Sequence, residues 1–230
     1  MRAGFAAAFV LLVGSPAHAD GPGPRRGFQM HYGVGVAVPA GNASGARGDT
    51  LGARYAWQVV PLDLGLGAKV SDDLYVGGVL RVGVGAEGSD TRVERACEDD
   101  DGTIDNEIAC SAASYQVGVE LRYGLGSADQ VNPWIGYGIA ADFGHQSIHD
   151  RVRARRETTT ARGVEWARLA VGLDHRMGRV GGLGPALAVG LGQYTHSRTE
   201  VNGEPVFDGP IEQTALHAWI TLTVRMVLFP

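Results

Sequence analysis

Apolar and non-apolar residues alternate one by one along eight separate stretches of this chain, and this alternation restricts its fold more than any other feature. Successive side chains of a β-strand point to opposite faces of a sheet, so a period of two predicts strands with one apolar face. None of the stretches spaces its apolar residues as an amphipathic helix does, so we expect no long helix after residue 19. The eight predicted strands are residues 28–38, 60–68, 74–85, 115–125, 135–144, 167–174, 187–192 and 216–226.

The connections between the predicted strands alternate in length. Short connections are expected near residues 69–73, 126–132 and 178–182, and long ones near 39–54, 88–112, 146–163 and 196–213. Strands of about 9–11 residues, short periplasmic turns and long outer loops are typical of bacterial outer-membrane barrels. We therefore predict an all-β fold, a closed eight-stranded antiparallel up-and-down transmembrane β-barrel.

The two faces of the predicted strands distinguish a membrane barrel from a soluble, lipocalin-like carrier. One face is almost entirely valine, leucine, isoleucine, alanine, tyrosine and phenylalanine, an apolar band too large for the surface of a soluble monomer. The other face combines charged residues with many of the 35 glycines, which suits the narrow interior of an eight-stranded barrel better than a pocket for an apolar ligand. The charged residues expected in that interior, where each needs a partner of opposite sign, are Arg81, Glu120, Arg122, Asp142, Arg168, Asp174 and Arg225.

From residue 27 to residue 229 the strand number, the alternation and the rhythm of the connections resemble the OmpA-type small outer-membrane β-barrels. Members of that family usually end in an alternating strand with a terminal aromatic residue, which the outer-membrane assembly machinery recognises. In this chain the last strand alternates as far as Leu228, Phe229 is off the apolar parity, and Pro230 follows. The resemblance implies insertion into outer-membrane lipid by that machinery, and we expect a monomer without a cofactor.

The first residues have the features of a secretory signal peptide. Arg2 precedes an apolar run over residues 3–13, and Ala17-His18-Ala19 matches the small-x-small pattern that a signal peptidase cleaves. The run is too short to cross a hydrocarbon core of about 30 Å, which argues against a membrane helix. We therefore expect a cleaved signal peptide over residues 1–19, a short extension over 20–26 and the barrel domain over 27–230.

The chain has two cysteines, Cys97 and Cys110, which export would place in an oxidising compartment. We expect a disulfide that closes the acidic loop between them, with free or metal-bound thiols as the alternative. Asp99, Asp101 and Asp105 in this loop are spaced like part of an EF-hand calcium loop, but two key ligand positions carry no carboxylate. A solvated acidic loop without a metal ion is the expected outcome.

The connection around residues 149–162 carries five arginines against two acidic residues. Arginine suits bidentate contacts with phosphate, so this loop is a candidate for binding lipopolysaccharide. It could instead pair with the acidic loop, or be mobile, which is the common behaviour of charged loops. The formal net charge of −5 gives no reason to expect nucleic acid as a partner.

One short motif suggests an enzyme. His145-Gln146-Ser147 resembles the His-x-Ser of outer-membrane lipid A deacylases, which are barrels with a lipid-facing triad completed by a glutamate. If the hairpin is symmetric about residue 155, Glu165 lies opposite His145, and a serine nucleophile, a histidine base and a glutamate that orients it would form a triad. The match is three residues long, and a similar pair at His196-Ser197 has no such support.

The sequence as a whole predicts a non-enzymatic outer-membrane β-barrel with a structural or surface-interaction role exerted through long extracellular loops. A lipid A deacylase-like hydrolase, a narrow channel and a soluble lipocalin-like carrier remain as alternatives.

Overall fold

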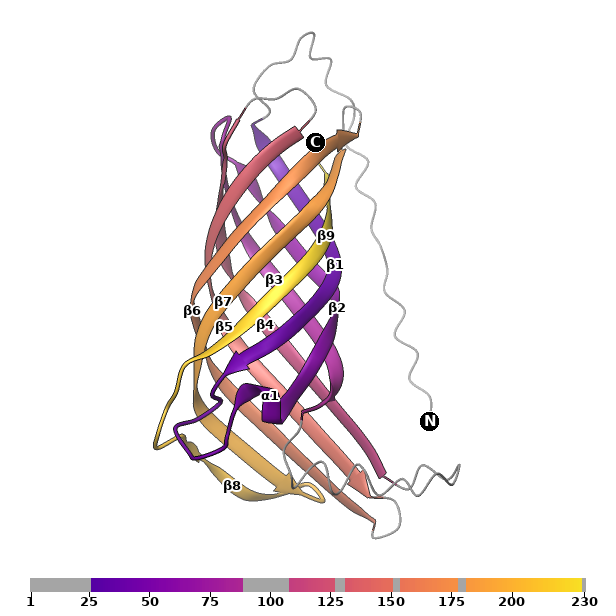
Figure 1. Cartoon of the computed structure of the whole chain (residues 1–230), viewed down its shortest axis with the longest axis vertical. Coiled ribbons are helices and arrows are strands. Elements are labelled where there is room, and N and C mark those ends of the chain that lie inside the picture. The colour runs from indigo at the N-terminus through magenta and orange to yellow at the C-terminus, as the bar shows by residue number, and fades with distance from the viewer. Residues whose placement is uncertain (1–25, 89–107, 127–130, 151–153, 178–180, 229–230) are drawn as a thin grey trace.

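One antiparallel sheet closes on itself to form an elongated barrel (Figure 1). The computed structural model describes residues 26–88, 108–126, 131–150, 154–177 and 181–228. Its elements are β1 (Gly27–Gly41), α1 (Leu51–Arg54), β2 (Tyr55–Lys69), β3 (Leu74–Glu87), β4 (Ile108–Gly124), β5 (Val131–Asp150), β6 (Arg155–Met177), β7 (Gly181–Val201), β8 (Glu204–Pro210) and β9 (His217–Leu228).

Eight of these strands form the closed ring. Neighbours in the chain pair from β1 to β7, and β9 closes the ring because it pairs with both β1 and β7. Strand β8 pairs only with β7 and lies outside the ring, beside the end of the barrel that also holds α1 (Figure 1). The predicted eight-stranded antiparallel up-and-down barrel is therefore confirmed.

Two of the connections predicted to be long loops are strands over most of their length. Strand β5 continues as far as Asp150, and β6 begins at Arg155. Strands β7 and β8 form a further hairpin at the same end of the barrel. The prediction of a mobile loop over residues 149–162 is therefore wrong for its described part, since Arg155, Arg156 and Arg162 lie in β6. Most residues of these extensions are polar, so no apolar alternation marks them, and the β-branched threonines at 158–160 favour their extended form.

Several β-bulges interrupt the pairings and reverse the side-chain parity within single strands, and two of them account for errors in the sequence predictions. The pairing of β2 with β3 shifts between Val59 and Leu62, and the pairing of β6 with β7 shifts between Glu165 and Ala167. A bulge adds one residue to one strand, so the residues before it change face relative to those after it. Val60, predicted on the apolar outer face, is consequently buried inside the barrel.

The outward face of the ring is an exposed band of apolar side chains. In the described part of the chain, helix α1 has one turn, and no helix is long and apolar enough to cross a membrane. Aromatic residues also lie on this outward face, as they do at the interfaces of membrane barrels. Exposed members of the band include Val34, Val36, Val117, Val119, Leu121, Tyr115, Tyr123, Ile135, Tyr137, Ile139, Leu169, Val171, Leu187, Leu222 and Val224.

Inward-facing glycines make room for large inward-facing rings. A Cβ atom added at Gly172 would clash with the indole of Trp134, and one added at Gly65 would clash with the imidazole of His31. The interior of an eight-stranded barrel is just wide enough to be filled by side chains, so a ring needs a neighbour without one. Close packing of this kind explains much of the high glycine content.

Residues 42–54, here called the mouth segment, fold into the end of the barrel that carries the long connections. Thr50 caps α1 by accepting the backbone N–H of Ala53 at 3.0 Å. Leu51 is fully buried in a cluster that includes Tyr55 and Trp219. The backbone N–H of Gly45 donates to the carbonyl of Gln213 at 2.6 Å, which joins the mouth segment to the connection between β8 and β9.

Candidate functional site: the charged lumen and its mouth

The lumen holds all seven charged residues that the alternation assigned to the interior. Six of them are at most 8% exposed, and the side chain of Glu120 is 14% exposed. Asp63 and Glu165 join them, so four arginines share the interior with five carboxylates. Buried charges are tolerated only when partners offset the loss of hydration, so the arrangement of the pairs decides whether this interior is stable.

Near the short-turn end, Arg225 donates to both carboxylate oxygens of Asp174, at 2.8 and 2.9 Å. The same guanidinium lies 4.0 Å from the centre of the Trp134 ring. Arg122 lies 3.9 Å from the ring centre of Tyr75 and pairs with Glu120 at 3.0 Å. Each of these two arginines therefore contacts a carboxylate and the face of an aromatic ring, a combination that offsets the loss of water around a guanidinium.

The middle of the lumen is a network of charged and amide side chains. Arg81 lies 3.4 Å from Asp63 and donates to the side-chain oxygen of Gln116 at 2.9 Å. Arg168 pairs with Glu165 at 3.1 Å and donates to the hydroxyl of Thr221 at 3.3 Å. These contacts join five strands of the ring, so the network fixes the strands against one another as well as neutralising the charges.

Two histidines take part in the same interior network. His31 lies 2.7 Å from a guanidinium nitrogen of Arg122 and 3.9 Å from Asp63. Nearer the mouth, the imidazole of His217 lies 3.0 Å from the fully buried carboxylate of Asp142. Both rings are interior hydrogen-bonding partners, and the described residues contain no group of three or more side chains that could hold a metal ion.

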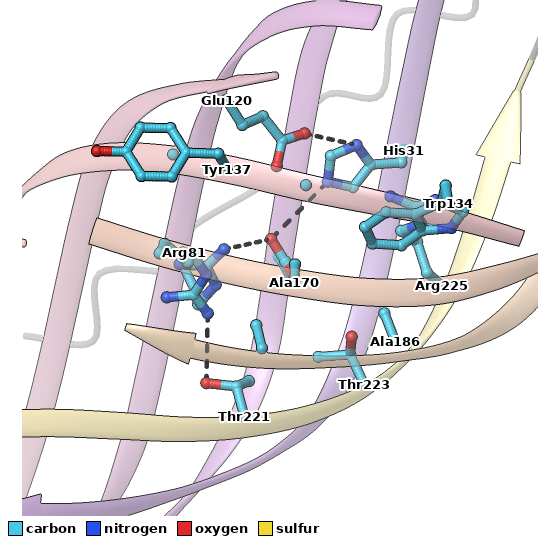
Figure 2. A pocket seen from close by; sticks show the side chains of 15 residues that line it. His31, Arg81, Glu120, Trp134, Tyr137, Ala170, Ala186, Thr221, Thr223 and Arg225 are labelled. Carbon is cyan, nitrogen blue, oxygen red and sulfur yellow. Dashed lines mark hydrogen bonds and ion pairs between the residues drawn. The ribbon is translucent and has the colours of Figure 1, made fainter. Parts of the chain in front are cut away.

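Among the described residues, these side chains leave little open space at the centre of the network. A cavity of about 30 Å³ lies at the centre of the network (Figure 2). One water molecule needs roughly 10–15 Å³ of such space, so the cavity has room for about two. Charged side chains from several strands contribute to its lining, among them His31, Asp63, Arg81, Arg168 and Arg225. The lumen therefore resembles a packed polar core more than a pore or a ligand pocket.

The barrel thus has a charged interior and an apolar exterior, the reverse of a soluble carrier. Among solved structures, the chain is similar to a major outer-membrane protein of Thermus thermophilus, with a TM-score of 0.51, 11% identity, and coverage of 88% of this chain and 99% of that one. The fold is that of an outer-membrane β-barrel.

Two other solved structures superpose less closely. AlkL, an outer-membrane protein studied in lipid bilayers, gives a TM-score of 0.48 at 15% identity, with 95% of this chain and 98% of that chain covered. OprG from Pseudomonas aeruginosa gives a TM-score of 0.48 at 10% identity, with 90% of this chain and 97% of that chain covered. No protein-family model matches the sequence, and no curated protein matches it significantly. The resemblance to OmpA-type barrels in particular stays a prediction.

The residues of the proposed hydrolase triad do not meet. Glu165, predicted opposite His145, lies opposite Ala140, while Thr160 lies opposite His145 and Thr158 opposite Ser147. The prediction is wrong because the hairpin turns earlier than residue 155, and because the bulge at Glu165 directs that side chain into the lumen, where it pairs with Arg168. A glutamate inside the barrel cannot orient a histidine on the opposite face of the wall.

Other predicted sites fall outside the described residues. Cys110 lies in β4, but its expected disulfide partner Cys97 is outside the described part, as are Asp99, Asp101 and Asp105. The signal peptide over residues 1–19 is also outside it. The disulfide, the acidic loop and the signal peptide therefore stay predictions.

Sequence reasoning missed several interior residues. Asp63 and Gln116 had the inward parity of their strands, and reading every polar residue of that face would have included them. Trp134, which no predicted strand included, faces the lumen, as does Tyr75, whose inward parity the alternation had given. The signal for them was the neighbouring run of glycines, since rings inside a narrow barrel need such space.

A clasp within the mouth segment keeps it folded over the lumen. Arg54 donates twice to the carboxylate of Asp49, at 2.6 Å for each contact, and the hydroxyl of Ser44 donates to the same carboxylate. Partial burial opposes ionisation of Asp49, but the hydrogen bonds from Arg54 and Ser44 outweigh it and hold the pKa of this carboxyl below its ordinary value. The clasp thus favours the ionised aspartate.

Replacing Asp49 with asparagine is expected to loosen the mouth segment and leave the barrel intact. Arg54 would lose its carboxylate partner, so trypsin should cleave after Arg47 or Arg54 several times faster than in the wild type at a mildly alkaline pH. Because the folded-state pKa of Asp49 is lowered, the clasp stabilises the wild type above about pH 4 and is lost as the pH falls below that value. The amides of residues 43–50 should therefore be less protected from hydrogen exchange below about pH 4 than above it, when each rate is compared with the intrinsic rate at the same pH.

Asp72→Asn is the matched control, because Asp72 is an exposed aspartate that also pairs with an arginine, Arg26, at 3.5 Å. Equal cleavage of the Asp49 variant and the wild type would contradict the role given to the clasp.

Proposed function

We propose that this chain is a non-enzymatic, non-conducting protein of the bacterial outer membrane, which acts through the surface at its long-connection end. One observation carries the proposal: ion-paired side chains from across the ring project into the lumen and surround a cavity of about 30 Å³ at its centre. When side chains fill the interior of a barrel, the residues that can contact other molecules are those on its outer surface.

The extent of the sheet supports a role at that end. Strand β5 continues from Phe143, the last aromatic residue of its outward face, to Asp150, and β6 begins as far out as Arg155. The hairpin of β7 and β8 adds exposed residues such as Val206 and Phe207 to the same region. Hydrogen-bonded strands hold these side chains in fixed positions, which suits recognition better than loose loops do.

The alternatives are less well supported. A channel needs a continuous aqueous path, which the interior pairs obstruct. A soluble carrier needs the opposite distribution of charged and apolar faces. The lipid A hydrolase needs Glu165 on the outer face, where it does not lie. Partners of the proposed role are the lipid and lipopolysaccharide of the outer membrane and its assembly machinery, with the protein a monomer.

Two measurements test the proposal. Mature protein extracted from isolated outer membranes should run as a folded, heat-modifiable band on a detergent gel. Purified barrels added to planar lipid bilayers should give no steady conductance steps, because charged pairs occupy the lumen. A soluble periplasmic protein without a heat shift would contradict the location, and regular conductance steps would establish a channel in place of the non-conducting role.

A further inference from the structure

The outer surface of the wall changes from apolar to basic within two residues of β6. Val164 and Trp166 are 49% and 42% exposed and belong to the apolar band. Arg162, the next residue on that face, is exposed and lies directly opposite Phe143 of β5. Two residues of a strand span about 7 Å, so Arg162 lies about 7 Å beyond the last apolar side chain of its strand. Around an apolar band embedded in a bilayer, that position is where the headgroup layer would begin.

Four basic residues meet on this surface from three adjacent strands. In one row, Arg162 of β6 lies between Phe143 of β5 and His196 of β7. In the next row outward, Thr160 of β6 lies between His145 and Arg198. Directly opposite residues have Cβ atoms about 5 Å apart and diagonal neighbours about 7–8 Å apart, so the long arginine side chains reach a common point. We call Arg162, Arg198, His145, His196 and Thr160 the rim patch.

Acidic neighbours lie on one side of the rim patch. Asp208 of β8 contacts His196 at 2.7 Å and Arg198 at 3.6 Å, and Glu200 contacts Arg198 at 2.5 Å. These carboxylates hold His196 and Arg198 in place on the β7–β8 side. Arg162 interacts electrostatically with Asp208, but no ion pair is seen for it within the described part of the chain, so its guanidinium remains accessible to an anion.

We propose that the rim patch binds a phosphate group carried by a lipid of the surrounding outer leaflet. This inference rests on the proposed function, because it requires the apolar band to lie in a membrane. The planar guanidinium of Arg162 offers paired donors to phosphate oxygens. Arg198, which Glu200 and Asp208 hold in place, adds further N–H donors. Thr160 lies on β6, two residues from Arg162 and directly opposite Arg198. Phe143 and Trp166 contact the acyl chains of the same lipid, which distinguishes lipid from free phosphate.

The test uses the mature barrel in a non-ionic detergent and counts bound lipid by native mass spectrometry during titration with diphosphoryl lipid A. The variant is Arg162→Gln with Arg198→Gln. The matched control is Arg155→Gln with Arg176→Gln, which removes two arginines of β6 outside the patch. A heat-modifiable band for each variant verifies that it is folded. Parallel titrations use dephosphorylated lipid A and a competition with millimolar inorganic phosphate.

We expect the patch variant to bind diphosphoryl lipid A at least tenfold more weakly than the wild type, and the control to bind within twofold of it. The wild type should prefer diphosphoryl over dephosphorylated lipid A by a similar factor. Undiminished binding by the patch variant, an equal loss in the control, or equal binding of the two lipids would overturn the inference. Complete displacement by inorganic phosphate would assign the patch to free phosphate and overturn it as well.

Failure of the inference and failure of the proposed function give different results. A folded barrel from outer membranes that binds the two forms of lipid A alike contradicts only the rim patch. A chain that is soluble and shows no heat-modifiable form contradicts the membrane location on which both proposals depend.

Discussion

Replacement of Arg225 with methionine is expected to lower the free energy of unfolding by about 3–5 kcal/mol, the usual cost of leaving one member of a buried ion pair alone. The carboxylate of Asp174 would lose both hydrogen bonds from Arg225 and stay buried near the short-turn end. Trp134 would lose the guanidinium that stacks on its ring. Urea unfolding of the barrel in lipid vesicles, followed by the loss of the heat-modifiable band, measures the change.

Two further variants make this prediction specific. Arg225→Met combined with Asp174→Leu should recover most of the lost stability, since removal of both charges leaves no unpaired group. Arg26→Met serves as the control, because Arg26 also pairs with an aspartate, but with its side chain 65% exposed, and exposed pairs contribute little. A small effect of Arg225→Met alone would mean that water reaches Asp174 and that the lumen is more open than described.

Replacement of Gly172 with valine is expected to destabilise the barrel by about 1–3 kcal/mol, because the new side chain would overlap the indole ring of Trp134. The guanidinium of Arg225 stacks on the same ring, 4.0 Å from its centre, so a shift of the ring away from the new side chain would disturb that contact. The same urea titration reports the loss.

Replacing the indole of Trp134 with a smaller side chain should recover part of the stability that the valine at position 172 removes. Gly172→Val combined with Trp134→Leu is expected to be more stable than Gly172→Val alone, which separates a steric clash from a general loss of backbone freedom. Gly126→Val is the matched control, since a Cβ atom there meets nothing within 4 Å. Equal destabilisation at positions 126 and 172 would show that the glycines serve the backbone and not the packing of interior rings.

The strand number, the order of the strands and most of the interior charges could be predicted from the sequence. Alternation is a local property of each strand, and it is strong wherever one face meets lipid and the other a packed interior. Arg81, Arg122 and Arg225 were placed inside by parity alone, and they are 6%, 5% and 3% exposed. Their partners could not be assigned in the same way, because pairing depends on the register between strands.

The bulges were the main source of error. One additional residue reverses the face of all the residues on one side of it, and no composition or spacing marks the insertion. Val60 and Glu165 were misplaced for this reason, and the error at Glu165 supported a catalytic triad that the fold does not form. The outer parts of β5, β6 and β7 and the whole of β8 were missed because they lie beyond the apolar band, where most residues are polar and the alternation is lost.

The strand that closes the barrel, β9, is the last strand in the described part of the chain. Strand β9 pairs along twelve residues with β1 and along twelve with β7, and β1 lies almost the whole length of the chain away from it. Until β9 is in place, both β1 and β7 expose unpaired edges that can join to other chains. Contacts between such distant segments form slowly, so ring closure is expected to set the rate of folding. A pause at that stage would leave a curved, open sheet as the species most prone to aggregate.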